Sequence, residues 1–128
     1  MSIFTRAANR AGGYAALAAR YPGGPEPPGR RWDRQSVMFA NTVAYKFCVR
    51  VVVAADGLWL QARPPAQGTQ SAIFVPWREI VRVEPVRLYW QAAMRVVCGE
   101  PEVGHFRLRR HIWQEADASW RAARPAPA

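Results

Sequence analysis

The chain has 128 residues, of which 50% are hydrophobic and 12% aromatic. This is enough for one domain with a substantial core, and it argues against intrinsic disorder. Lysine and arginine number 18 against 9 aspartates and glutamates, so the net charge is +9, and every one of these cations except Lys46 is an arginine. No stretch reaches the roughly 18 apolar residues of a membrane-spanning helix, which predicts a soluble protein.

The positive charge has two interpretations. It would attract an anionic partner, such as a lipid headgroup surface, a nucleic acid or an acidic protein. It is also the expected outcome of a coding bias that enriches Arg, Ala, Gly and Pro together, since the arginines are scattered along the chain. The nearest approach to a cluster is Arg107, Arg109 and Arg110. Charge alone therefore does not identify a partner.

The start of the chain is predicted to form a short helix followed by a linker. Tyr14, Leu17, Ala18 and Tyr21 follow the i, i+3, i+4, i+7 spacing of an amphipathic helix. Residues 22–29 are rich in proline and glycine, and such a linker would let the helix fold back without fixing its angle.

We therefore divide the chain into an N-terminal helix and linker (1–30), one domain (31–123) and a disordered tail (124–128). Arg6 and Arg10 precede a stretch with one leucine and many alanines and glycines, which resembles an export signal only weakly. A cytoplasmic location is the expectation.

The middle of the chain alternates apolar and polar residues with the period of two that is typical of half-buried strands. The expected strands are 37–41, 47–53, 58–61, 73–75, 81–90, 94–98 and 106–108. In the second of these, Phe47 is expected to share one face with Val49, Val51 and Val53. Residues 51–55 are apolar on both faces, so another element must cover one of them, and the N-terminal helix is the candidate.

Two turns are predicted from glycine and proline. Asp56-Gly57 is expected to supply the positive φ angles of a tight hairpin turn. Pro76 should end the strand before it, after which Trp77 and Ile80, three residues apart, would lie on one side of a tight turn.

The strand after this turn carries a change of phase. Val81 and Val83 point one way, whereas Val86, Leu88 and Trp90 keep the apolar side only after a shift of one residue. Pro85 sits between the two sets, so the pattern predicts a bulge or bend there.

A terminal amphipathic helix follows the last strand. Its apolar positions recur at helical spacing at Ile112, Trp113, Ala116, Trp120 and Ala123, with Arg110, Gln114, Asp117 and Arg121 on the opposite face. The fold class is therefore mainly β: an antiparallel barrel or split barrel of about seven strands, capped by a C-terminal helix and preceded by a short N-terminal helix.

This order resembles the pleckstrin-homology (PH) and GRAM-like superfold, and small bacterial proteins of that type in particular. The matching residues are Gly57-Leu-Trp-Leu60 and Ile73–Ile80, with weaker support from His105–Trp113 as last strand into helix. The resemblance spans residues 36–120 and implies a fold, not a chemistry. The loop at 63–70 lacks a basic phosphoinositide pattern, so the lipid binding of some relatives is not carried over.

Metal and nucleophilic sites are not indicated. Cys98, His105 and His111 have spacings that match no zinc pattern. Cys48 and Cys98 lie among valines on predicted strands, where a thiol normally keeps its proton and packs as a small hydrophobe.

General acid–base sites are not indicated either. Glu79 is expected to form a solvated ion pair with Arg78 or Arg82. We expect no catalytic residues, no cofactor and no metal.

Binding is the remaining class of function. The tryptophans are expected to be mostly core, with Trp32 beside Arg30 and Arg31 as the exception. Candidate residues for an anionic partner form an arginine rim around the last helix: Arg107, Arg109, Arg110, Arg121 and Arg124. The sequence favours a non-catalytic binding or assembly module that engages a protein or an anionic membrane surface. One alternative is a nucleic-acid-binding protein that uses the same rim and Trp32. A second alternative is an enzyme of unknown type, which would require a deep pocket that gathers Glu79, His105 and His111.

Overall fold

The computed structural model describes residues 13–40 and 43–124. The predictions for the first ten residues and for positions 125–128 of the tail lie outside this range. The elements, in chain order, are α2 (Tyr14–Arg20), β1 (Arg30–Phe39), β2 (Val43–Val53), β3 (Gly57–Ala62), β4 (Ile73–Pro76), the 3₁₀ helix η1 (Trp77–Glu79), β5 (Ile80–Leu88), β6 (Gln91–Cys98), β7 (Gly104–Arg109) and α3 (Arg110–Ala123).

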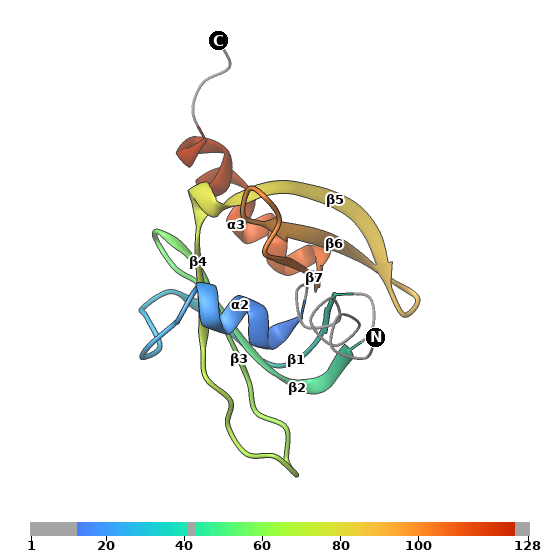
Figure 1. Ribbon diagram of the computed structural model, residues 1–128. Helices are drawn as coiled ribbons and strands as arrows, with labels where there is room; N and C mark the ends of the chain where they lie inside the picture. Colours follow the sequence, from blue (N-terminus) through green and yellow to red (C-terminus); the bar gives the residue numbers. More distant parts are fainter. Residues whose placement is uncertain (1–12, 41–42, 125–128) are drawn as a thin grey trace, which may run out of the picture.

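All seven strands belong to one antiparallel sheet in the order β4-β3-β2-β1-β7-β6-β5. The sheet curls into a half-barrel, with β5 and β6 arching over one side and α2 lying across the other (Figure 1). Strand β1 joins the two halves, because it pairs with β2 along its length and with β7 only at Met38 and Phe39. The predicted fold class is confirmed. Neither α2 nor α3 has the length and apolar character that crossing a membrane requires.

The central turn is formed as predicted. Strand β4 ends at Pro76, and η1 then places Trp77 and Ile80 in the core at 4% and 1% exposure. The Trp77 indole donates a hydrogen bond of 2.9 Å to the carbonyl of Ala55 and meets Trp113 edge to face. Trp77 therefore ties the β2–β3 turn to the C-terminal helix.

Helix α3 packs its predicted apolar face into the curl of the sheet. Ile112, Trp113, Ala116 and Trp120 are buried in the same core cluster as the inward residues of the strands. The Trp120 indole donates a 2.8 Å hydrogen bond to the carbonyl of Ile80, so the helix also satisfies a backbone group at the start of the edge strand β5.

Helix α2 packs on the inner side of the sheet and contacts the β2–β3 hairpin through Tyr14, which meets Tyr45 of β2 and hydrogen-bonds Ala62 of β3. Tyr14 and Leu17 are buried with Val51 and Leu60. The Tyr14 hydroxyl donates to the carbonyl of Ser71 and accepts from the backbone N–H of Ala62, at 2.5 and 3.0 Å.

The proline- and glycine-rich linker is fixed in place, which differs from the prediction of a loose tether. The N–H of Gly23 donates to the carbonyl of Ala72, and the N–H of Phe74 donates to the carbonyl of Tyr21, so the chain runs along the edge of β4. The Trp59 indole, on the outer face of the hairpin, donates 3.2 Å to the carbonyl of Gly24. The prediction was wrong because composition does not reveal these backbone hydrogen bonds.

Gly57 has a different role from the one predicted. Neither Asp56 nor Gly57 has a positive φ angle, and Gly57 is the first residue of β3. A Cβ at Gly57 would collide with the carbonyl oxygen of Val75 and the ring of Phe74 on the neighbouring strand. Glycine is needed here for the close approach of β4 rather than for turn geometry.

The bulge predicted at Pro85 is also displaced. The irregularity in β5 lies between Ile80 and Arg82, and Pro85 keeps regular register opposite Met94. Proline is tolerated there because β5 is the edge of the sheet, where its missing N–H breaks no ladder. Leu88 is buried as expected, but Trp90 is 90% exposed in the turn after β5.

Candidate binding surface

Three of the five predicted rim arginines lie along α3, and two of them, Arg121 and Arg124, contact the ring of the buried Trp120. Arg110 and Arg121 line a surface cavity of about 290 Å³ along α3. Arg124 lies 4.8 Å from the centre of the Trp120 ring and donates to the carbonyl of Val81. The Asp117 carboxylate accepts a 2.8 Å hydrogen bond from Arg121 and another from the Trp113 indole. The carboxylate lowers the positive charge of this part of the rim.

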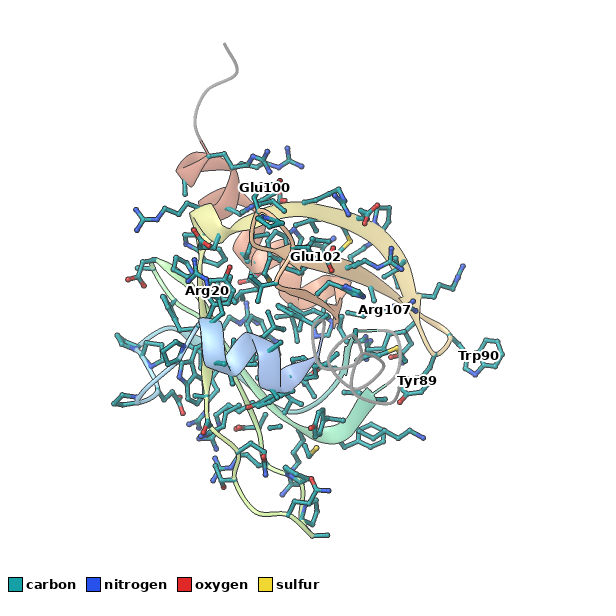
Figure 2. The ribbon with its side chains drawn as sticks, in the orientation of Figure 1. Arg20, Tyr89, Trp90, Glu100, Glu102 and Arg107 are labelled. Atoms are coloured by element: carbon teal, nitrogen blue, oxygen red, sulfur yellow. The ribbon has the colours of Figure 1, made fainter. Side chains whose placement is uncertain are left out.

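The other two rim arginines are on β7. Arg107 donates a 2.9 Å hydrogen bond to the carbonyl of Arg87, so it braces the β5–β6 hairpin (Figure 2). Arg109 is the last residue of β7 and lies opposite Ala93 of β6. Arg107 therefore belongs to the hairpin side of the sheet and not to the cavity along α3.

The acid–base candidate Glu79 lines a surface cavity of about 370 Å³ together with Glu100, Arg20 and Arg78. Glu79 accepts a 2.9 Å hydrogen bond from the Tyr21 hydroxyl and lies 3.6 Å from Arg20, which corrects the expected pairing with Arg78 or Arg82. Arg82 instead pairs with Glu84. Sequence spacing did not reveal that α2 reaches this turn.

The metal-ligand candidates are dispersed. His105 pairs with Glu102 at 2.7 Å, and His111 lies against Trp32. Cys98 is fully buried. Over residues 13–40 and 43–124, no group of three or more His, Cys, Asp or Glu side chains gathers where a metal ion would bind.

One exposed aromatic pair projects from the molecule at the turn between β5 and β6. We call Tyr89 and Trp90 the aromatic tip; they are 44% and 90% exposed. Tyr89 has a φ of +57°, a left-handed conformation that a tyrosine rarely adopts. Figure 2 shows Trp90 pointing away from the rest of the molecule at the end of this hairpin.

The surroundings of the aromatic tip are basic. Arg87 donates to the carbonyl of Trp90, and the ammonium of Lys46 on β2 lies 5.4 Å from the centre of the Tyr89 ring. The sequence has no acidic residue between Glu84 and Glu100. The tip therefore combines exposed aromatic surface with cations and lacks an acidic neighbour in sequence.

Phe47 adds a third exposed aromatic ring next to Lys46. It is expected from the sequence to share a face with the valines of β2, but it is 74% exposed and has a φ of +55°. The strands explain this, because β2 carries two more residues than β1 between the pairs Gln35–Val49 and Val37–Tyr45. The Phe47 N–H donates to the Ser36 hydroxyl instead of to the ladder. The bulge turns the ring outward.

Strand β1 has a second bulge beside the first. The register slips by one residue between Trp32 and Gln35, and Arg34 in this gap has a φ of +55°. The slip explains how Trp32, outside the alternating pattern, packs against the core with Val37 and Phe39. Its indole face is covered by Arg30, 4.9 Å from the ring centre.

A cavity of about 410 Å³ lies between the two bulges, and we call it the bulge cavity. It is lined by Asp33, Arg34, Phe47, Cys48, Arg50, Arg63 and Pro65. The hydrogen bond from Arg50, with Arg31 and Arg63 nearby, holds the pKa of Asp33 below its usual value. Burial raises the pKa of the Cys48 thiol. The cavity therefore contains a carboxylate, a neutral thiol and three guanidinium groups at neutral pH.

The chain matches no family model, no curated protein and no solved structure. Geometry and chemistry alone carry the functional argument.

Proposed function

We propose that this chain is a non-catalytic binding module of the PH/GRAM-like type that attaches to an anionic membrane surface through the aromatic tip. The architecture that supports the first half is a curled sheet of seven antiparallel strands followed by a packed C-terminal helix. The observation that carries the second half is Trp90, which is 90% exposed at the end of a hairpin with Arg87 and Lys46 beside it.

Indole and phenol rings favour the boundary between lipid headgroups and acyl chains, where the apolar ring is buried and the polar edge stays hydrated. Each lysine or arginine near an anionic bilayer adds about 1 kcal/mol of attraction. The aromatic tip offers both components on one projecting turn. The indole of Trp90 is exposed to water in the free protein, and burial at a membrane interface would explain why a tryptophan occupies this turn.

The two thiols support a role without nucleophilic catalysis. Burial raises the pKa of both Cys48 and Cys98, so each stays a protonated, weakly nucleophilic thiol at neutral pH. Glu79 is held by the Tyr21 hydroxyl and by Arg20, which supports a structural role for this carboxylate.

The residues that the sequence suggested for nucleic-acid binding already have partners within the protein. Trp32 is half-buried and covered by Arg30, which itself pairs with Glu115 at 2.7 Å. Arg121 of the rim is occupied by Asp117. Stacking of a base on Trp32 would require these contacts to break.

The test is a comparison of partners for the purified full-length chain. We expect cosedimentation with vesicles that contain phosphatidylserine and little with pure phosphatidylcholine vesicles, and the binding should weaken as salt screens the cations. Fluorescently labelled single-stranded DNA and duplex DNA are titrated in the same buffers. Retention on DNA that exceeds retention on anionic vesicles at equal ionic strength would favour the nucleic-acid alternative and overturn the membrane proposal.

A further inference from the structure

The bulge cavity is made by two neighbouring strands that are irregular at the same place. Arg34 on β1 and Phe47 on β2 both have left-handed backbone angles, with φ near +55°, and both side chains line the cavity. Such a conformation is unfavourable for a non-glycine residue, and residues of this kind concentrate at binding sites. Bulges likewise occur preferentially where a side chain has to be redirected.

The charges that face the cavity are unbalanced. Arg50 is held by Asp33 at 2.6 Å and by Glu26 at 2.9 Å, so its orientation is fixed. In the described part of the chain, the side chains of Arg34 and Arg63 have no hydrogen bond and no ion pair within 4 Å, and Arg63 lies close enough to the cavity carboxylate of Asp33 to help lower its pKa. Two guanidinium groups are therefore available to a ligand beside a third that is already oriented.

The position of Arg63 is set by backbone contacts. Its N–H donates 2.7 Å to the carbonyl of Cys48, which places the residue across from the β2 bulge where β3 ends. Guanidinium groups bind the oxygens of phosphates through paired N–H donors. Two of them match the double negative charge of a phosphate monoester.

We propose that the bulge cavity binds a phosphate monoester. The guanidinium groups of Arg34 and Arg63 hold the dianion, and the exposed ring of Phe47 contacts the organic group. A volume of about 410 Å³ exceeds what a phosphate alone requires, which leaves room for that group between Phe47 and Pro65. The ligand is either a soluble phosphate ester or the terminal phosphate of a lipid headgroup; the chemistry of recognition is the same. This inference does not depend on the aromatic tip.

The test is an NMR titration of the ¹⁵N-labelled full-length chain with phenyl phosphate, glycerol phosphate and inorganic phosphate. We expect amide shifts centred on residues 33–36, 47–50 and 62–65, with phenyl phosphate bound most tightly because it alone stacks on Phe47. Arg34→Asn keeps a residue that tolerates the left-handed backbone, and Arg63→Gln keeps a polar chain. Each should weaken phenyl phosphate binding roughly tenfold, the loss of one charge-assisted pair.

Three controls separate the site from general charge effects. Arg121→Gln removes an exposed arginine on α3 and should leave the affinity unchanged. Arg63→Lys should bind phenyl phosphate more tightly than Arg63→Gln, because it restores the positive charge. Phe47→Asn should weaken phenyl phosphate but not inorganic phosphate. The backbone amide spectra of all variants report whether the fold is intact.

Vesicles distinguish the source of the phosphate. Phosphatidic acid carries a terminal phosphate monoester, whereas phosphatidylserine carries only a diester. If the chain prefers vesicles with phosphatidic acid at equal surface charge and Arg34→Asn loses this preference, the ligand is a lipid headgroup. If soluble esters shift the amides and the chain shows no such preference, the ligand is a soluble phosphate ester. Both outcomes support the inference. It is overturned if millimolar phosphate esters shift no amide near the cavity, or if Arg121→Gln weakens binding as much as Arg63→Gln. If only Trp90→Ala loses vesicle binding, the result tests the aromatic tip and does not bear on the bulge cavity.

Discussion

The ammonium nitrogen of Lys46 lies 5.4 Å from the centre of the Tyr89 ring. Lys46 is on β2 and Tyr89 is in the turn between β5 and β6, and the strands β1 and β7 lie between β2 and β6 in the sheet order. Phe47 is the next residue after Lys46. The contact therefore makes the aromatic tip and the β2 bulge neighbouring parts of one surface, which neither element would form alone.

Replacing this lysine tests its electrostatic role. Lys46→Gln should weaken binding to phosphatidylserine vesicles about fivefold, the effect of one cation near an anionic bilayer. The free energy of unfolding should change by less than about 1 kcal/mol, because an exposed cation–π contact is weak. Cosedimentation and urea denaturation measure the two quantities. Lys46→Arg keeps the charge and should bind like the parent; equal losses in both variants would show that charge is not the cause.

Trp77 is the residue on which the central turn depends for stability. Trp77→Ala should lower the free energy of unfolding by roughly 3–5 kcal/mol, because the change empties a core site and removes the hydrogen bond to Ala55. Chemical denaturation followed by circular dichroism measures it. Trp90→Ala is the matched control, since replacing a tryptophan that is 90% exposed should change the free energy of unfolding by less than about 0.5 kcal/mol. A loss below about 1 kcal/mol in Trp77→Ala would contradict its place in the core.

The Tyr14 hydroxyl links α2 to the end of β3. Tyr14→Phe keeps the ring but leaves the N–H of Ala62 without its partner. We expect a loss of about 1–3 kcal/mol, the cost of an unsatisfied buried donor. Urea denaturation measures the loss, and hydrogen exchange at Ala62 should accelerate. Unchanged exchange at this amide would mean that the hydroxyl does not protect it.

The sequence pattern predicted the elements well where the alternation is regular. Val37 and Phe39, Trp77 and Ile80, and the buried face of α3 are all where the pattern of apolar residues places them. These positions are determined by burial against a single core, which the periodicity of a strand or a helix records directly.

The candidate surface was much harder to predict, because the backbone leaves regular geometry there. Phe47 and Trp90 continue an apolar alternation, yet a bulge turns one outward and a hairpin turn exposes the other. Nothing in the sequence predicts the left-handed backbone angles at Arg34, Phe47 and Tyr89, because these residue types seldom adopt them. The one available hint was Tyr89-Trp90 between two strands, the length of a two-residue hairpin turn.

The two cysteines should differ in reactivity. Burial raises the pKa of both thiols, and Cys98 is fully buried whereas Cys48 is half-exposed at the bulge cavity. A raised pKa means less thiolate at a given pH, so at pH 8 Cys48 should react with a disulfide reagent more slowly than free cysteine, and faster as the pH rises. Cys98 should react only after unfolding in denaturant. Rapid modification of both thiols in the native protein would contradict the packing of β6.

The most direct test of the membrane proposal compares Trp90→Ala with Arg121→Gln for binding to phosphatidylserine vesicles. Both variants change one exposed side chain, on the aromatic tip and on α3 respectively. We predict that Trp90→Ala weakens cosedimentation on the order of tenfold through loss of interfacial indole burial, while Arg121→Gln binds like the parent because its guanidinium is paired with Asp117 on α3. Equal vesicle binding by the parent and Trp90→Ala would contradict the account.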